Sequence, residues 1–310
     1  MNPKVNIEKQ DGIAIVSIDN PPVNALSQAV RAGLVACIDK AAADPGITAV
    51  ILTCKGRTFI AGADIKEFGK PAEAPFLPDA LDVLEHCPKP VIAAVHGTAL
   101  GGGLEAAMAC RYRIAAESAA VGLPEVHLGL IPGAGGTQRL PRIAGLGNAL
   151  DMITSGRHVS AKEAESMGLI DRTTNDDKLL ESAIDFAREI VGSGAARKPA
   201  SEMQLENSTE NQQLVEAWKS RVGKKARGQQ SPLVALESVK NSLHMSFTEG
   251  MAKERQLFAR CVASEQSKAL RYIFFAERAA AKLPADISAS PIPVEAAAVI
   301  GGGTMGRGIA

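Results

Sequence analysis

The chain has 310 residues, enough for about two domains, and its 34 basic and 34 acidic residues balance. No overall charge therefore favours binding to nucleic acid or to an anionic membrane surface. The five cysteines and five histidines are scattered without the spacing of metal ligands, which predicts buried thiols in a reducing compartment and no metal site. The sequence contains no apolar run long enough to span a membrane and no signal peptide at its start.

The amino-terminal segment has the pattern of strands and helices that alternate. Residues 5–8 and 13–18 alternate apolar and polar side chains around an Asp-Gly pair, which predicts a β-hairpin. A helix capped by Ser27 is expected over residues 28–43, and a continuous apolar strand over residues 47–54. This order predicts an α/β fold in which helices cover a mostly parallel sheet.

A glycine-rich turn follows the short apolar strand expected over residues 91–95. Gly101, Gly102 and Gly103 open a predicted helix, and the free N–H groups at a helix start bind anions. No Lys-Ser or Lys-Thr pair follows, as a nucleotide P-loop would require, and Glu105 in the first helical turn would repel a phosphate. A transient oxyanion on a carbonyl fits better, with a carboxylate nearby for proton transfer.

The pattern changes in the carboxyl-terminal third. From about residue 197 no strand is expected, and four helical segments form a predicted helical annex. A Pro/Ala-rich stretch then has the composition of a linker. Beyond it, a small apolar strand is expected over residues 294–300, followed by a G-x-G-x-x-G pattern that is weak when it stands alone. The predicted domains are a core over 1–195, the annex over 196–278, a linker over 279–293 and the start of a further domain over 294–310.

Five motifs resemble the crotonase superfamily, the enoyl-CoA hydratases and isomerases, and in particular the amino-terminal part of the multifunctional β-oxidation enzymes. The resemblance covers nearly the whole chain. It implies a crotonase-type spiral of ββα repeats followed by a helical annex. The motifs are PPVNALS (21–27), FIAGADIKEF (59–68), HGTALGGGLE (96–105), GLPEVHLGLIPGAGGTQRLPR (122–142) and YIFFAERAA (272–280).

The resemblance implies hydration of a 2-trans-enoyl-CoA to a 3-hydroxyacyl-CoA. The backbone N–H groups of Ala63 and Gly102 would bind the thioester oxygen. Glu105 would orient and deprotonate a water molecule, and Glu125 would deliver a proton to C2. Glu125 alone could also move a proton between C4 and C2, so Δ3,Δ2-enoyl-CoA isomerisation is expected as a second activity.

Each of these residues also has a purely structural explanation. The glycine turns could serve only tight packing, and the two acids could be only a helix-start charge and a surface acid. Thioester hydrolysis and non-catalytic binding of acyl-CoA remain alternative functions. The resemblance further implies contacts with the substrate by Leu26, Ala61, Asp64, Ile65, Pro124 and Gly133.

The glycine pattern near residue 300 lies where the multifunctional enzymes begin a Rossmann dehydrogenase domain. Gly301, Gly303 and Gly306 would be an incomplete NAD fingerprint, without a second strand or an acidic residue for the ribose, so no NAD binding is expected. The chain is thus expected to be a truncated multifunctional enzyme, with an acyl-CoA substrate and no cofactor of its own. No nucleic-acid or membrane partner is expected. A monomer and a homotrimer are both open, and the location would be cytoplasmic in a bacterium or peroxisomal in a eukaryote.

Overall fold

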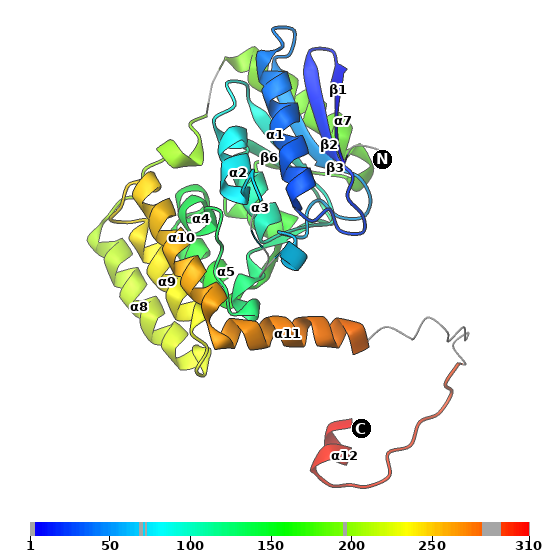
Figure 1. Cartoon of the computed structure of the whole chain (residues 1–310), viewed down its shortest axis with the longest axis vertical. Helices are drawn as coiled ribbons and strands as arrows, with labels where there is room; N and C mark the ends of the chain where they lie inside the picture. The colour runs from blue at the N-terminus through cyan, green and yellow to red at the C-terminus, as the bar shows by residue number, and fades with distance from the viewer. Residues whose placement is uncertain (1–3, 68–70, 72, 195–196, 281–292, 310) are drawn as a thin grey trace. The chain divides into compact units, whose positions relative to one another are not determined.

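A computed structural model describes the chain, except for residues 1–3, 68–70, 72, 195–196, 281–292 and 310 (Figure 1). The chain divides into two compact units, Met1–Arg271 and Tyr272–Ala310. The predicted core and most of the predicted annex belong to the first unit. Most of the predicted linker lies outside the described residues, and the predicted domain boundaries stay predictions.

A six-stranded sheet forms the centre of the first unit, in the order β1-β2-β3-β4-β6-β9. Strands β1 and β2 form the predicted hairpin and are antiparallel, whereas every other neighbouring pair is parallel. The apolar runs of β2, β3 and β4 are almost fully buried because helices cover both faces. The strands are β1 (Val5–Gln10), β2 (Ile13–Ile18), β3 (Ala49–Cys54), β4 (Val91–Val95), β6 (Tyr112–Ala116) and β9 (Arg172–Thr174).

A smaller sheet of three strands, in the order β5-β7-β8, stands beside the first. Its strand β5 starts three residues after β4 ends, so the chain passes directly from one sheet into the other. The glycine turn at residues 101–103 follows β5 at once. The strands are β5 (Thr98–Leu100), β7 (Ala120–Gly122) and β8 (His158–Ser160).

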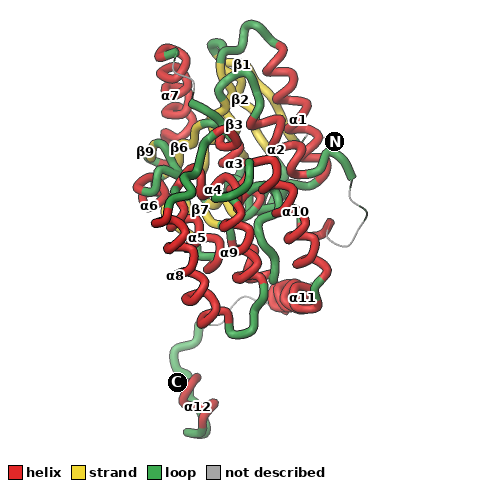
Figure 2. The backbone as a smooth tube through the Cα atoms, turned by 90° about the vertical axis from the view of Figure 1, so that its left-hand side faces the viewer, coloured by secondary structure: helices red, strands yellow, loops and turns green. Residues whose placement is uncertain are grey.

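Helices pack on both sides of the large sheet, with α7 on one side and α1 and α2 on the other (Figure 2). This arrangement confirms the predicted α/β class. The helices of this part are α1 (Gln28–Ala43), α2 (Leu77–Glu85), α3 (Gly102–Ala109), α4 (Gly136–Ala144), α5 (Leu146–Ser155), α6 (Ala161–Ser166) and α7 (Leu179–Ser193), with the 3-10 turns η1 (Ile65–Glu67), η2 (Pro124–Leu128) and η3 (Asp176–Lys178).

The start of α1 differs from the prediction. The Ser27 hydroxyl does not cap the helix; it is buried and has no hydrogen-bond partner among the described residues. The carboxylate of Glu67, 39 residues away, accepts the N–H of Gln28 at 2.7 Å instead. A distant charged acceptor at the positive end of the helix dipole therefore replaces the local hydroxyl.

The annex packs on α4 and α5 through its central helix α9, beside α8 and α10 (Figure 1). The predicted capping box at Ser246 and Glu249 opens α10, with both of its hydrogen bonds present. No described helix is long and apolar enough to cross a membrane. The annex elements are η4 (Ala200–Glu202), α8 (Thr209–Ala226), α9 (Ser231–Asn241), α10 (Phe247–Ala263) and α11 (Glu265–Ala280).

The strand predicted in the second unit is wrong. Residues 294–300 form no strand, and Val294 and Ile300 are 80% and 100% exposed. A strand needs a neighbour for its N–H and C=O groups, and the described part of this unit contains no strand to pair with. The helix predicted after the glycines does form, as α12 (Thr304–Ile309).

The first turn of α3 lies so close to the backbone of Ile60 that only glycine fits at position 103. A Cβ there would stand 2.1 Å from the Ile60 carbonyl oxygen. We predict that Gly103→Ala lowers the free energy of unfolding by about 2 kcal/mol or more, because the backbone must move. Gly223→Ala, in the last turn of α8 where an added Cβ would contact nothing, is the matched control and should stabilise by up to about 0.5–1 kcal/mol. Urea unfolding measures both, and equal effects of the two substitutions would contradict the close contact.

Candidate active site

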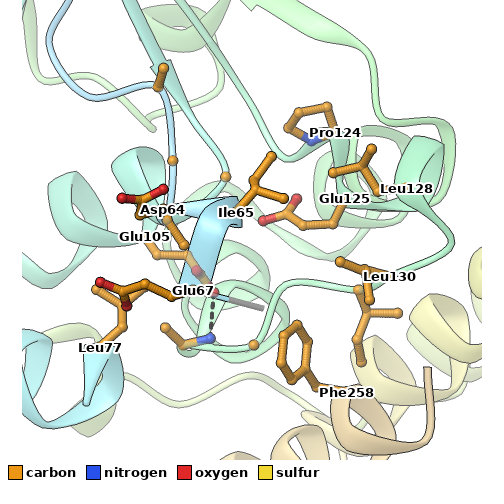
Figure 3. Close-up of a pocket in the computed structure, with 18 of the residues that line it drawn as sticks. Asp64, Ile65, Glu67, Leu77, Glu105, Pro124, Glu125, Leu128, Leu130 and Phe258 are labelled. Carbon is orange, nitrogen blue, oxygen red and sulfur yellow. Dashed lines mark hydrogen bonds between the residues drawn. The ribbon is translucent and has the colours of Figure 1, made fainter. Parts of the chain in front are cut away.

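A cavity of about 380 Å³ opens between the two glycine-rich turns, η2 and the annex helix α10 (Figure 3). It brings together residues that are up to about 200 positions apart in the sequence. Most of its wall is apolar, and four acids together with the first-turn backbone of α3 supply polar groups. A largely apolar cavity with a few convergent polar groups is typical of a small-molecule site. The lining includes Ala61, Ala63, Asp64, Ile65, Gly101, Gly102, Glu105, Pro124, Glu125, Gly133 and Phe258.

The two glycine-rich turns lie against each other at one wall of the cavity. A Cβ on Gly102 would stand 3.2 Å from the backbone nitrogen of Ala63, so the two amides are close neighbours. Gly102 is the first residue of α3, and its N–H therefore has no acceptor inside the helix. Gly101 has a φ of +53°, and a Cβ there would approach Glu125 Oε1 to 3.0 Å. The turn thus needs glycine for its conformation and for its closeness to the acid.

Glu105 lies in the first turn of α3 and is 2% exposed. Its Oε1 accepts the N–H groups of Ala134 and Gly136, each at 2.8 Å. Burial raises the pKa of the Glu105 carboxyl, whereas these two N–H groups and the charge of Arg139 lower it. The donors favour the ionised form, so Glu105 is suited to accept a proton.

Glu125 enters the cavity from η2, and Figure 3 shows its carboxyl group directed towards the same space as that of Glu105. Its Oε2 is buried and has no hydrogen-bond partner within the described residues. Burial and then the charge of Glu105 raise the pKa of Glu125 well above its ordinary value. Glu125 is therefore the acid of the two that keeps its proton more readily, which is the difference an acid–base pair requires.

A buried ion pair supports this arrangement from behind. Arg139 of α4 is 1% exposed and contacts Glu85 Oε2 of α2 at 2.7 Å. The same guanidinium donates to the carbonyl oxygen of Ala134, one of the residues whose N–H holds Glu105. Because the pair is fully buried, loss of either partner would leave an uncompensated charge next to the site.

Sequence reasoning missed three groups that the fold brings to the site. Phe258 of α10 lines the cavity with its ring against Gly133, and Arg31 of α1 pairs with Glu67 at 2.7 Å at the edge. Glu254 of α10 is fully buried behind Glu105. One pattern in the sequence did indicate that Glu254 is buried. Position 254 lies on the same helical face as Gly250, Leu257 and Cys261, and this face points inward.

Five of the six predicted substrate contacts line the cavity, namely Ala61, Asp64, Ile65, Pro124 and Gly133. The side chain of Leu26 instead lies in the core with no exposed area, and it reaches the site through its N–H, which donates to Gly62. Gly301, Gly303 and Gly306 belong to the other unit, where Gly303 precedes α12 and Gly306 lies inside it. No cluster of His, Cys, Asp and Glu with the arrangement of a metal site occurs among the described residues.

Curated relatives match almost the whole chain. The chain is 44% identical over 302 residues to the peroxisomal bifunctional enzyme of Danio rerio, an alignment that covers 96% of this chain and 42% of that protein. It is 38% identical to the peroxisomal fatty acid beta-oxidation multifunctional protein MFP2 of Arabidopsis thaliana, with 97% and 43% covered. The chain therefore spans less than half the length of these relatives.

Solved structures share the fold over most of this chain. Enoyl-CoA hydratase from Bacillus anthracis is 30% identical with a TM-score of 0.58, covering 88% of this chain and 96% of that one. Carnitinyl-CoA hydratase from Mycobacterium avium is 28% identical with a TM-score of 0.65, covering 89% and 97%. Residues 8–249 match the family described as enoyl-CoA hydratase/isomerase. The predicted resemblance is confirmed, and the chain belongs to the enoyl-CoA hydratase/isomerase family, the crotonases.

Proposed function

We propose that this chain hydrates 2-trans-enoyl-CoA to 3-hydroxyacyl-CoA and also isomerises Δ3- to Δ2-enoyl-CoA. The observation that carries the proposal is that two acids at one cavity differ in their hydrogen-bond partners and in the charges near them. Glu105 accepts two backbone N–H groups, which lower its pKa against the effect of burial. Glu125 has an oxygen without a partner among the described residues, and the charge of Glu105 raises its pKa further. One acid is thereby ready to accept a proton and the other to donate one.

The neighbouring amides of Ala63 and Gly102 support a role in binding the thioester oxygen. Hydration at C3 pushes electron density onto this oxygen through an enolate-like transition state, and two fixed N–H groups in a largely apolar cavity stabilise that charge. Loss of one such donor typically costs about 3–4 kcal/mol of transition-state stabilisation. Side-chain substitution does not remove an N–H, so the small residues at both positions serve close approach.

Each of the two acids carries out one proton transfer during the addition of water. Glu105 takes a proton from the water molecule as the water oxygen bonds to C3, and Glu125 gives its proton to C2. Electrons of the C2–C3 double bond move towards the thioester carbonyl and return as C2 is protonated. The charges balance, because one carboxyl group gains the proton that the other loses.

The apolar end of the cavity supports the placement of the acyl chain. Leu128, Leu130 and Phe258 face the cavity beyond the two acids (Figure 3). The loop of Ala61, Asp64 and Ile65 also lines the cavity, and we place the CoA portion along it. Burial of an acyl chain against these side chains would contribute about 25 cal/mol per Å² of apolar surface.

Two other functions remain as competitors, thioester hydrolysis and non-catalytic binding of acyl-CoA. Hydrolysis would release free CoA, whereas hydration consumes the conjugated 2-enoyl absorbance without releasing a thiol. We further propose that the chain is the amino-terminal part of a multifunctional β-oxidation enzyme. The peroxisomal location of the relatives supports a peroxisomal one here if the source is a eukaryote. The oligomeric state and the absence of NAD binding stay predictions.

Removal of either acid should abolish most of the hydration. Glu105→Gln and Glu125→Gln keep the shape of each side chain, and we expect each to lower kcat by about three orders of magnitude, since each removes one proton-transfer group. Glu117→Gln, at an exposed acid beyond β6, is the matched control and should leave kcat unchanged. Loss of the 2-enoyl absorbance measures the rate. Full activity in either variant of the pair would reject the mechanism.

Isomerisation should depend on the two acids unequally. We expect Glu105→Gln to retain isomerase activity within about tenfold of the unmodified chain, because one acid–base group suffices to move a proton between C4 and C2. Glu125→Gln should lose both activities. A 3-enoyl-CoA substrate measures this by the appearance of the conjugated 2-enoyl absorbance. Equal loss in the two variants would contradict the separate roles.

The pH profile of hydration should be bell-shaped, and both limbs should lie above pH 4.5. Glu105 must be ionised and Glu125 protonated, and burial raises the pKa of each above the ordinary value of 4.5. Activity therefore rises with pH as Glu105 loses its proton and falls as Glu125 does. These limbs report the pair and not single residues. Measurement of kcat/KM against pH checks this, and an acid limb at or below pH 4.5 would be inconsistent with a buried base.

A further inference from the structure

Glu254 is the second carboxyl group that binds the start of helix α4, and it comes from the annex. Its side chain has no exposed area. Its Oε1 accepts the N–H of Gly135 at 2.7 Å, and its Oε2 accepts the N–H of Thr137 at 2.9 Å and the Thr137 hydroxyl. A carboxylate buried with three donors is held in one position.

The same turn binds Glu105, with the donors in alternation. Ala134 and Gly136 donate to Glu105, whereas Gly135 and Thr137 donate to Glu254. Ala134 and Gly135 precede the helix, and Gly136 and Thr137 are its first two residues, so none of the four N–H groups has an acceptor inside the helix and two acids can share them. Any movement of Glu254 would therefore turn the donors that hold Glu105.

The hydroxyl cluster beside Glu254 suits either protonation state. The Thr137 hydroxyl lies 2.7 Å from the Ser238 hydroxyl, and either oxygen is able to donate. If Glu254 is ionised, Thr137 donates to it; if Glu254 is protonated, Thr137 accepts from it and Ser238 reorients. Glu254 therefore keeps its hydrogen bond to the Thr137 hydroxyl in either protonation state.

The nearby cations have other partners. Arg139 of α4 pairs with Glu85, and neither it nor Arg142 is among the causes that move the pKa of Glu254. Burial, and then the charge of Glu105, raises the pKa of Glu254 to about 8. The charge of Glu254 in turn is one of the causes that raise the pKa of Glu125. The charged residues on the elements packed against α10 are Arg139 and Arg142 of α4, Glu237 and Lys240 of α9, and Glu202 of η4, with Glu105 and Glu125 beyond α4.

We propose that Glu254 is a positioning residue of the hydration site: it fixes the turn that holds Glu105, and its charge keeps the proton on Glu125 as the pH rises. This role rests on the proposed function. A nearby negative charge favours the protonated form of an acid, so removal of that charge must lower the pKa of Glu125. Glu254 does not line the cavity, so its effect reaches the substrate only through the other two acids.

The test is Glu254→Gln, which keeps the shape of the side chain and removes its charge. We expect the alkaline limb of the kcat/KM profile to move to lower pH by about 0.5 unit or more, a change of about 0.7 kcal/mol at 1.36 kcal/mol per unit. We expect kcat to fall about tenfold while KM stays within about twofold. Glu237→Gln, an acid of α9 that faces Arg260 at the surface, is the matched control and should change neither.

A second readout does not depend on catalysis. NMR of the protein with ¹³C-labelled glutamate carboxyl groups follows the protonation of Glu125, whose signal is assigned by its loss in Glu125→Gln. The midpoint of this signal should fall in Glu254→Gln and stay constant in Glu237→Gln. An unchanged midpoint in folded Glu254→Gln overturns the proposal. If the midpoint falls but the unmodified chain hydrates no enoyl-CoA, the coupling stands and the proposed function fails.

Failure of Glu254→Gln to fold still leaves a decisive measurement. In the unmodified protein the Glu125 signal should show a second, smaller step at the pH where Glu254 titrates, since coupled acids sense each other's charge. Glu254→Asp, which retains the charge, assigns the Glu254 signal by its loss. A Glu125 titration without that second step overturns the proposal.

Discussion

The start of helix α4 is the interaction on which the site depends. Its first N–H groups have no acceptors inside the helix and carry the positive end of the helix dipole. Two buried acids, Glu105 and Glu254, supply the missing acceptors from opposite sides. Each acid would be costly to bury alone, and the turn would be costly to bury without them. The acids and the turn therefore stabilise each other, and this fixes Glu105 relative to the cavity.

The same turn explains how two glutamates in one cavity come to differ. Glu105 is buried and Glu125 is half-buried with its Oε2 enclosed, and burial raises the pKa of both carboxyl groups. Of these two acids only Glu105 accepts N–H groups of the α4 turn, and the negative charge of Glu105 raises the pKa of Glu125 further. The separation of the two protonation states is therefore a property of backbone geometry, whereas the acids supply only identical carboxyl groups.

How much the sequence predicts depends on the distance over which each contact forms. The hairpin at residues 5–18 and the glycine turn with Glu105 are local, and their patterns predict them. The Glu67 carboxylate reaches α1 from 39 residues away, and Glu254 reaches the site from more than 110. The helical pattern of α10 indicates that position 254 is buried, but no local pattern indicates either contact. For residues 294–300 the local pattern predicts a structure that does not form. The apolar run predicts a strand, but a strand needs a partner strand, and the described residues of this unit contain none.

The contacts of Glu254 also bear on how the annex relates to the core. The boundary predicted near residue 196 marks the end of strand patterns, yet the first compact unit continues to Arg271. Without α10, the N–H groups of Gly135 and Thr137 would lose their acceptors in the interior. Without the α4 turn, Glu254 would be a buried acid with no donors. Each part thus leaves buried polar groups unsatisfied when the other is absent, at a cost of about 1–3 kcal/mol per group. A change in secondary structure along the chain is therefore not a division of this site, because the annex supplies one of the two acids that hold the α4 turn in place.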